Sequence, residues 1–306
     1  MKICVIDIGT NSMRLLVSYF KDNKFMTRKK YVNTTRIGKG VDEFGYLTKD
    51  AIDNNVNALI EFKKICDENK CEQVYCIGTS ALRDSKNKEE FIKNAKEKTN
   101  IDVSVISGEE ESYLGFKGVL SGVETSENIL VIDIGGGSTE FIVGNSKEIL
   151  FSKSEDIGAL RLTEKFFDDK FSNEESILNM ENFINNTIKE TINIIKNYEI
   201  GKVVGIGGTI TSVSAINQEL EVYSMEKIHN SEIYSNNIEN IFDNLKNMTL
   251  DDKKKVKGLQ EKRADIIVSG VGILNIIMKN IEKDTIVVSE YDNLEGLVCE
   301  KVRNMS

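Results

Sequence analysis

The sequence contains no proline and no tryptophan, and only one of its 306 residues is a histidine, His229. Average usage would place about 15 prolines in a chain of this length, so chemistry built on cis-proline is excluded. A single histidine also excludes a zinc site with two histidine ligands and an H-E-x-x-H protease. A Ser-His-Asp triad is barely within reach, because it needs just one histidine.

Cysteines and long apolar runs are also scarce. The five cysteines are odd in number and contain no C-x-x-C pair, a pattern typical of buried or incidental thiols in a reducing compartment. No run of about 18 uncharged apolar residues is present, which excludes a membrane-spanning helix. An acidic residue, Asp7, follows too early for the apolar region of a secretory leader. We therefore expect a cytoplasmic protein without membrane attachment.

Acidic residues outnumber basic ones, 49 against 40, and the net charge is −9. A protein that coats nucleic acid would be basic overall, so this balance argues against a nucleic-acid partner. It does not exclude a polyanionic ligand held by a few local groups. The content of hydrophobic residues, 40%, is that of an ordinary globular protein. At about 150 residues per domain, the length indicates two domains.

A short apolar segment that ends in Asp-Ile-Gly occurs twice, 126 residues apart. The first copy is residues 2–8 with the turn at 9–12, and the second is residues 128–134 with the turn at 135–138. Each copy resumes as a second apolar segment, which predicts strand, tight turn and strand. A duplicated unit at the head of each half places a domain boundary near Gly122.

The remaining patterns predict alternating helices and strands. We expect helices at residues 50–68, 89–98, 109–120 and 177–195, and strands at 74–78, 103–107, 202–204 and 285–289. Residues 32–46 are interpreted as a glycine-punctuated loop with a short strand. Residues 219–260, which are polar and rich in lysine and asparagine, are interpreted as helices and loops. A third glycine turn, residues 205–209, follows the strand at 202–204.

Turns of this kind are suited to binding phosphate. Their glycines let main-chain N–H groups approach phosphate oxygens closely, and a serine or threonine adds a hydroxyl donor. An aspartate at the strand end can hold a metal ion or its waters. One such turn is weak evidence, but three in a chain with two similar halves indicate a cleft between the halves. The candidate phosphate donors are Thr10, Asn11, Ser12, Gly135, Gly136, Gly137, Ser138, Gly208 and Thr209.

Seven stretches in order along the chain carry a resemblance to a known family. They are IDIGTNSMRL, GTSALRDSKN, VISGEEESYLGFKGV, VIDIGGGSTEF, SEDIGALRLTEKF, VVGIGGTITSV and EKRADIIVSGVGIL. Together they resemble the exopolyphosphatase and guanosine pentaphosphate phosphohydrolase family, within the actin, sugar kinase and Hsp70 superfamily.

The resemblance implies an α/β fold of two ribonuclease-H-like (actin-like ATPase) domains, each a mixed sheet flanked by helices, with an interdomain cleft. We expect domains at residues 1–122 and 123–292, with a C-terminal helix near 293–306 packing back on the first. We expect a chain similar to the compact, two-domain members, without the extra C-terminal domains of the longer ones. The family also implies a homodimer.

The implied activity is that of an exopolyphosphatase, which removes terminal orthophosphate from inorganic polyphosphate with Mg²⁺ or Mn²⁺. A monovalent cation is a further candidate cofactor. Hydrolysis of guanosine pentaphosphate (pppGpp) uses the same turns and stays open as an alternative. Two other classes also stay open: an ATP-dependent kinase of the superfamily, and a non-catalytic polyphosphate or alarmone sensor.

The resemblance assigns Glu111 as the catalytic base or water-orienting group. Phosphoanhydride hydrolysis depends more on positioning and charge stabilisation than on a strong nucleophile, so a carboxylate is suitable. A structural alternative exists for its neighbours, because Ser107 and Glu110 have the spacing of a helix capping box. We interpret Glu109 and Glu110 as helix-start residues only.

The family's metal-binding acids correspond to Asp133 and Glu140, and Asp7 is their counterpart in the first half. An aspartate after a strand is more often a turn cap, which is the structural alternative. Arg14 and Arg83 match family arginines near the phosphate chain, where a planar guanidinium makes bidentate contacts. For Arg14 a surface salt bridge is the alternative.

Two further features leave questions open. The basic patch, residues 253–257 with Lys262 and Arg263, is interpreted either as a solvated helix face or as a track for a polyphosphate tail. Near the C-terminus the family commonly has Gly-Leu-Arg-Glu-Gly, whereas this chain has Leu294 in place of the arginine. If that arginine contributes to binding of the polyphosphate chain or to a domain contact, the affinity of this protein for polyphosphate is in question.

Overall fold

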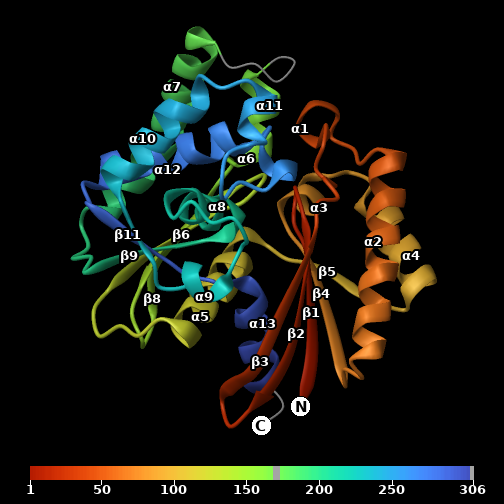
Figure 1. Cartoon of the computed structure of the whole chain (residues 1–306). Helices are drawn as coiled ribbons and strands as arrows, with labels where there is room; N and C mark the ends of the chain where they lie inside the picture. The colour runs from red at the N-terminus through yellow and green to blue at the C-terminus, as the bar shows by residue number, and fades with distance from the viewer. Residues whose placement is uncertain (168–172, 304–306) are drawn as a thin grey trace. The chain divides into compact units, whose positions relative to one another are not determined.

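The computed structural model describes residues 1–167 and 173–303, and they divide into two compact units. Unit 1 comprises Met1–Ser121 and the segment from Asn293, and unit 2 comprises Gly122–Asp292. Figure 1 shows both units, and each is described here by itself. No helix among the described residues is both long enough and apolar enough to span a membrane.

Unit 1 is a mixed five-stranded sheet in the order β3-β2-β1-β4-β5. The first three of these strands are antiparallel neighbours, and β4 and β5 join β1 in parallel. Its strands are β1 (Lys2–Ile8), β2 (Met13–Lys21), β3 (Lys24–Asn33), β4 (Gln73–Gly78) and β5 (Val103–Val105). Its helices are α1 (Val41–Phe44), α2 (Lys49–Glu68), α3 (Ser80–Asp84), α4 (Lys88–Thr99), α5 (Gly108–Gly122) and α13 (Asn293–Arg303).

Alternate residues of β1 supply the two faces of this sheet, because successive strand side chains point to opposite sides. Cys4 and Ile6 pack with the apolar stripes of α2 and α4. Ile3 and Val5 pack with α13, the helix at the far end of the chain. Figure 1 shows α2 and α4 on one side of the sheet and α13 on the other. Unit 1 is therefore a three-layer α/β unit.

Unit 2 is a mixed six-stranded sheet in the order β10-β11-β9-β6-β7-β8. Its strands are β6 (Ile129–Ile134), β7 (Thr139–Gly144), β8 (Ile149–Glu155), β9 (Lys202–Ile206), β10 (Glu232–Tyr234) and β11 (Thr285–Val288). Its helices are α6 (Ala159–Phe166), α7 (Glu174–Ile195), α8 (Gly207–Asn217), α9 (Met225–Ile228), α10 (Ser235–Lys246), α11 (Leu250–Lys253) and α12 (Ile267–Ile281), with a 3-10 turn at Glu261–Arg263.

The order β8-β7-β6-β9-β11 in unit 2 repeats the order β3-β2-β1-β4-β5 in unit 1, with the same parallel and antiparallel neighbours. The buried core of unit 2 is formed by β6 with α7, α10 and α12. The predicted fold class, two mixed sheets flanked by helices, is confirmed. The sequence prediction missed β3 and β8, both of which are only partly buried.

Candidate functional site

The first glycine turn, residues 9–12, connects β1 to β2 and is closed by a hydrogen bond of 3.1 Å from the N–H of Gly9 to the carbonyl of Ser12. The carbonyls of Thr10 and Asn11 accept hydrogen bonds from the loop at residues 36–38. Within the described residues, no hydrogen bond starts from the main-chain N–H groups of Thr10, Asn11 or Ser12. Consecutive N–H groups without an internal acceptor can bind an anion.

The second turn, residues 135–138, repeats this geometry between β6 and β7. The N–H of Gly135 donates to the carbonyl of Ser138 at 3.0 Å, and the carbonyls of Gly135 and Gly136 accept from the first N–H groups of α6. In the described part of the chain, the N–H groups of Gly136, Gly137 and Ser138 donate to no protein atom. The duplication therefore extends from the strands to individual hydrogen bonds.

The third turn differs, because α8 begins directly at Gly207, whose φ of +86° lies in the left-handed region. Thr209 is buried in the first turn of this helix. A Cβ added to Gly208 would lie 1.9 Å from Nη2 of Arg263, so the guanidinium packs directly on Gly208. Sequence reasoning placed Arg263 only in the basic patch. The EKRADIIV stretch that contains it was the signal that could have identified it as a neighbour of this turn.

The two acids predicted to bind metal in unit 2 face each other across a strand pair. Asp133 and Glu140 are register partners on β6 and β7, so both side chains lie on one face of the sheet. Both are buried, and Oε1 of Glu140 accepts a hydrogen bond of 2.7 Å from Ser154. A Cβ on Gly207 would lie 2.4 Å from Oδ1 of Asp133, so this carboxylate adjoins the third turn. The pair and the third turn thus form one locus in unit 2.

In unit 1 the equivalent register positions are Asp7 on β1 and Arg14 on β2. Asp7 is 3% exposed, and its Oδ2 accepts from Nε of Arg14 at 3.2 Å and also from Nη2. A predicted metal ligand and a predicted phosphate-binding arginine are therefore ion-paired with each other. Among the described residues, no group of three His, Cys, Asp or Glu side chains is arranged to hold a metal ion.

Glu111 lies in the first turn of α5 and is buried. Nη1 of Arg83 donates to Oε2 of Glu111 at 3.2 Å and to the carbonyl of Ile106 at 3.0 Å. The structure therefore brings together the predicted base and one predicted arginine. Its neighbour Glu110 has the interpreted structural role, because it forms a reciprocal capping box with Ser107 at 2.9 and 3.1 Å.

Part of the basic patch is buried or ion-paired within unit 2. Lys253 is buried, and its desolvation lowers the pKa of the ammonium group. Lys254 pairs with Asp251 at 2.9 Å, and Lys255 pairs with Asp252 at 3.2 Å. Acids on the same short helix therefore pair with two of the six basic residues of the patch.

The residue that replaces the family's C-terminal arginine lies in the interior of unit 1. Leu294 is fully buried in α13 and packs with Ile3, Val5 and Leu16. Its role in this chain is hydrophobic packing.

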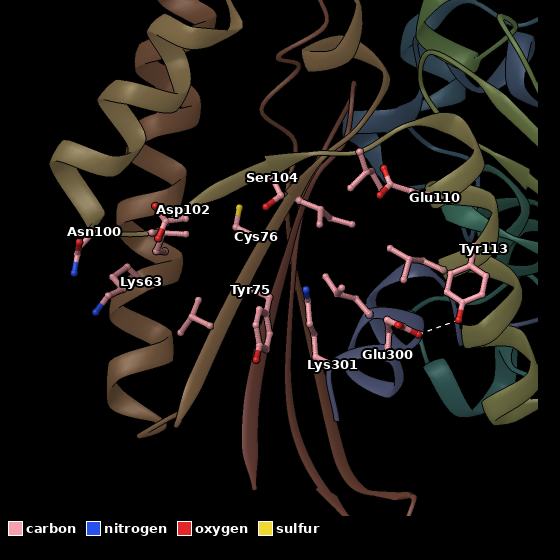
Figure 2. Close-up of a pocket in the computed structure, with 16 residues that line it drawn as sticks. Lys63, Tyr75, Cys76, Asn100, Asp102, Ser104, Glu110, Tyr113, Glu300 and Lys301 are labelled. Atoms are coloured by element: carbon pink, nitrogen blue, oxygen red, sulfur yellow. Dashed lines mark hydrogen bonds between the residues drawn. The ribbon is translucent and has the colours of Figure 1, made fainter. Parts of the chain in front are cut away.

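A groove of about 830 Å³ in unit 1 lies apart from the predicted site residues. Figure 2 shows that it passes over Tyr75 and Cys76 on β4 and continues toward Glu110 and Tyr113 on α5. Tyr113 donates a hydrogen bond of 2.9 Å to Glu300 at its edge. None of the residues predicted to bind phosphate or metal lines this groove.

The pKa values of the cysteine thiols are shifted in opposite directions, because a hydrogen bond with Cys4 lowers the pKa of Cys66. All five are free thiols, and burial raises the pKa of Cys76 well above its ordinary value and that of Cys71 to a lesser extent. A neutral, protonated thiol is a poor nucleophile.

A sheet order that occurs twice, each time with an acid and a glycine turn at the end of its first strand, defines an α/β protein of the actin-like ATPase fold. Residues 16–305 match the Ppx/GppA phosphatase family. The chain therefore belongs to that family.

Three similar proteins illustrate the family's range. A Fusobacterium nucleatum bifunctional 3-dehydroquinate synthase/phosphatase is 40% identical over 98% of this chain and 46% of its own length. A guanosine-5'-triphosphate,3'-diphosphate pyrophosphatase of Vibrio vulnificus is 29% identical over 98% of this chain and 59% of its own. The chain thus spans about half the length of these two relatives. The crystal structure of an exopolyphosphatase from Cytophaga hutchinsonii is 30% identical, with a TM-score of 0.91 over 99% of this chain and 98% of that one.

Proposed function

We propose that this chain hydrolyses the terminal phosphoanhydride bond of inorganic polyphosphate and releases orthophosphate. The observation that carries the proposal is the pair of equivalent turns. Each turn has three main-chain N–H groups for which no atom of the described residues is a hydrogen-bond acceptor. Donors of this kind bind successive phosphate oxygens without regard to any base or sugar. The likeness to the Cytophaga exopolyphosphatase over nearly the whole chain also supports it.

In this proposal Glu111 orients the attacking water and accepts its proton. Arg83 is the group that fixes the carboxylate, because one guanidinium nitrogen bonds both Oε2 of Glu111 and the carbonyl of Ile106. The other guanidinium nitrogens of Arg83 can contact phosphate oxygens of the substrate. Glu111 is thereby held in a fixed position, which phosphoryl transfer requires more than a strong base.

The acids of unit 2 fit a magnesium ion. Mg²⁺ retains several waters and is usually bound by one or two carboxylates together with substrate phosphates, so a group of three acids is not required. Asp133 and Glu140 are two buried carboxylates on one face, and we propose that they hold the ion. When bound, such an ion neutralises negative charge that develops on the phosphoryl oxygens. Mn²⁺ suits the same oxygen ligands.

Hydrolysis of pppGpp is the second candidate, favoured by the likeness to the Vibrio pyrophosphatase. The same turns and acids would act on its 5'-triphosphate. The two substrates differ in the guanosine that pppGpp carries, so a direct comparison of turnover separates them.

The test is orthophosphate release, with Mg²⁺, from long polyphosphate, short polyphosphate, pppGpp and ATP side by side. The chain is compared with Glu111→Gln and with a matched control, Glu109→Gln. Glu109 lies in the same helical turn but is exposed and outside the Arg83 contact.

Release from polyphosphate that collapses in Glu111→Gln but persists in Glu109→Gln supports the proposal. Release from pppGpp alone favours the second candidate, and turnover of ATP with transfer to an acceptor indicates a kinase. Binding of polyphosphate without any release contradicts the enzymatic proposal and indicates a sensor.

A further inference from the structure

Three of the five cysteines come together within unit 1. Cys4 on β1 and Cys66 on α2 belong to one buried core, and Cys71 packs against that core. The thiol of Cys4 forms hydrogen bonds with the side chains of Cys66 and Cys71. We call Cys4, Cys66 and Cys71 the thiol cluster.

The turn that ends α2 brings Cys66 and Cys71 together. Lys70 has a φ of +54°, in the left-handed region, and the chain reverses there. The N–H of Cys71 donates to the carbonyl of Cys66 at 3.1 Å, and the N–H of Lys70 donates to the carbonyl of Asp67 at 2.9 Å. These two bonds define a Schellman motif, in which the side chains at the positions of Cys66 and Cys71 frequently pack together. A disulfide needs two main-chain segments that lie close to one another, and this motif supplies them.

The strand that follows holds Cys71 beside Cys4. The N–H of Glu72 donates to the carbonyl of Lys2 at 2.9 Å, and the N–H of Lys2 donates to Oε1 of Glu72 at 2.9 Å. From there β4 runs parallel to β1, with Val74 as the register partner of Cys4. The thiol cluster is therefore held by α2, β1 and the start of β4, all of which belong to unit 1.

The three thiols differ in their access to solvent and in their acidity. Cys4 and Cys66 are buried, whereas Cys71 is partly exposed. The hydrogen bond from Cys4 lowers the pKa of Cys66, and the same bond raises the pKa of Cys4. A thiol that meets solvent beside a second thiol with thiolate character is the arrangement of a reversible oxidation site.

We propose that Cys66 and Cys71 form a reversible disulfide when hydrogen peroxide is the oxidant. In the first step the Cys71 sulfur attacks peroxide, the O–O bond breaks, and a sulfenic acid and one water are formed. In the second step the Cys66 sulfur attacks the sulfenic sulfur and the S–S bond forms. The hydroxyl group leaves with the Cys66 proton as a second water. Two thiols are thus oxidised, and one peroxide is reduced to two waters.

Cys4 remains a thiol in this reaction. It donates its hydrogen bond to the Cys66 sulfur, so Cys66 is the better nucleophile of the two buried thiols. The first step is the slower one, because burial raises the pKa of the Cys71 thiol and leaves little thiolate.

The test is treatment of the unmodified folded chain with hydrogen peroxide, followed by alkylation of the remaining thiols, trypsin digestion and mass spectrometry. Cleavage after lysine and arginine places the three cysteines of the cluster in separate peptides, residues 3–14, 65–70 and 71–83. The expected product is peptide 65–70 linked to peptide 71–83. It is lighter by about 2 Da than the two peptides together, because two hydrogens are lost, and reduction with dithiothreitol removes it.

Serine variants identify the two sulfur atoms. The link is expected to disappear in Cys66→Ser and in Cys71→Ser. It is expected to remain in Cys4→Ser and in Cys76→Ser, the latter of which removes the other cysteine of peptide 71–83. Cys299→Ser is the matched control, because Cys299 is also partly exposed but packs against a different core cluster.

The inference is overturned if peptide 71–83 is linked to peptide 3–14, or if the link passes through Cys76. Addition of oxygen to Cys71, about 16 Da per atom, without any link also overturns it. The same holds if every thiol of the folded chain can still be alkylated under conditions that oxidise the chain in urea. The unmodified chain decides the question even if a serine variant does not fold. Orthophosphate release plays no part in this assay, so its outcome is independent of the proposed function.

Discussion

A buried carboxylate that joins α13 to β3 gives the sharpest stability prediction. Glu295 is fully buried, and its two oxygens bind two cations of β3. Arg28 contacts Oε1 at 2.8 Å, and Lys30 contacts Oε2 at 3.1 Å. Both cationic side chains are themselves at least 87% buried, at 13% and 10% exposure.

Replacing Glu295 by alanine leaves two positive charges in the interior of unit 1 without this carboxylate. Removing one partner of a buried ion pair costs about 3–5 kcal/mol, because the remaining charges lose the attraction of this carboxylate while they stay largely desolvated. With a urea dependence of about 1–3 kcal/mol per M, the unfolding midpoint of unit 1 is expected to fall by at least about 1 M.

The assay must report on unit 1 separately, and the chain has no tryptophan. Hydrogen exchange of β3 peptides, measured by mass spectrometry across a urea series, reports on unit 1 alone and does not need tryptophan fluorescence. Glu282→Ala is the control, because the Glu282 pair with Lys196 is exposed and is expected to contribute nothing measurable. Replacing Arg28, Lys30 and Glu295 together by methionine, methionine and leucine is expected to recover most of the loss. A midpoint in Glu295→Ala equal to that of Glu282→Ala refutes the reasoning.

Three further predictions concern the proposed site. Gly158→Ala places a Cβ 2.4 Å from the carbonyl oxygen of Gly136, so the second turn must shift, and orthophosphate release falls together with about 1–3 kcal/mol of stability. Unchanged release would show that this turn binds no substrate. Chelation of divalent ions abolishes orthophosphate release, and added Mg²⁺ restores it. Half-maximal release by Asp133→Asn is expected to need at least about tenfold more Mg²⁺, because one of the two proposed ligands has lost its charge. An unaltered Mg²⁺ titration in that variant argues against the metal assignment. Double replacement of Lys254 and Lys255 by glutamine leaves KM for long polyphosphate unchanged at low salt, because neighbouring acids already pair with both; a raised KM supports the polyphosphate track.

The duplicated turns could be predicted because their signal is local. Asp133 and Glu140 are seven residues apart around a four-residue turn, and this spacing makes them partners across the hairpin. Asp7 and Arg14 have the same spacing and the same register. Hairpin geometry thus converts a sequence interval directly into a contact.

Contacts between distant segments could not be predicted in this way. The strand β3, Lys24–Asn33, has a basic, weakly apolar sequence, and its charges are compensated by Glu295 at the opposite end of the chain. The packing of Arg263 on Gly208 joins residues 55 positions apart. No local period reveals such pairs, because they depend on how separate elements pack.

Unit 1 is built from both ends of the chain, and this has a consequence for synthesis. A ribosome completes Met1–Ser121 before α13 exists, so the face of Ile3, Val5 and Leu16 has the side chain of Leu114 from α5 but lacks those of α13 at that stage. About 170 residues of unit 2 must be added first, which takes roughly 9 to 34 seconds at about 5–20 residues per second. During that interval the part of this apolar face that α13 later covers is exposed, and a chaperone can bind it. Unit 2 is continuous in sequence and can fold before the first unit is complete.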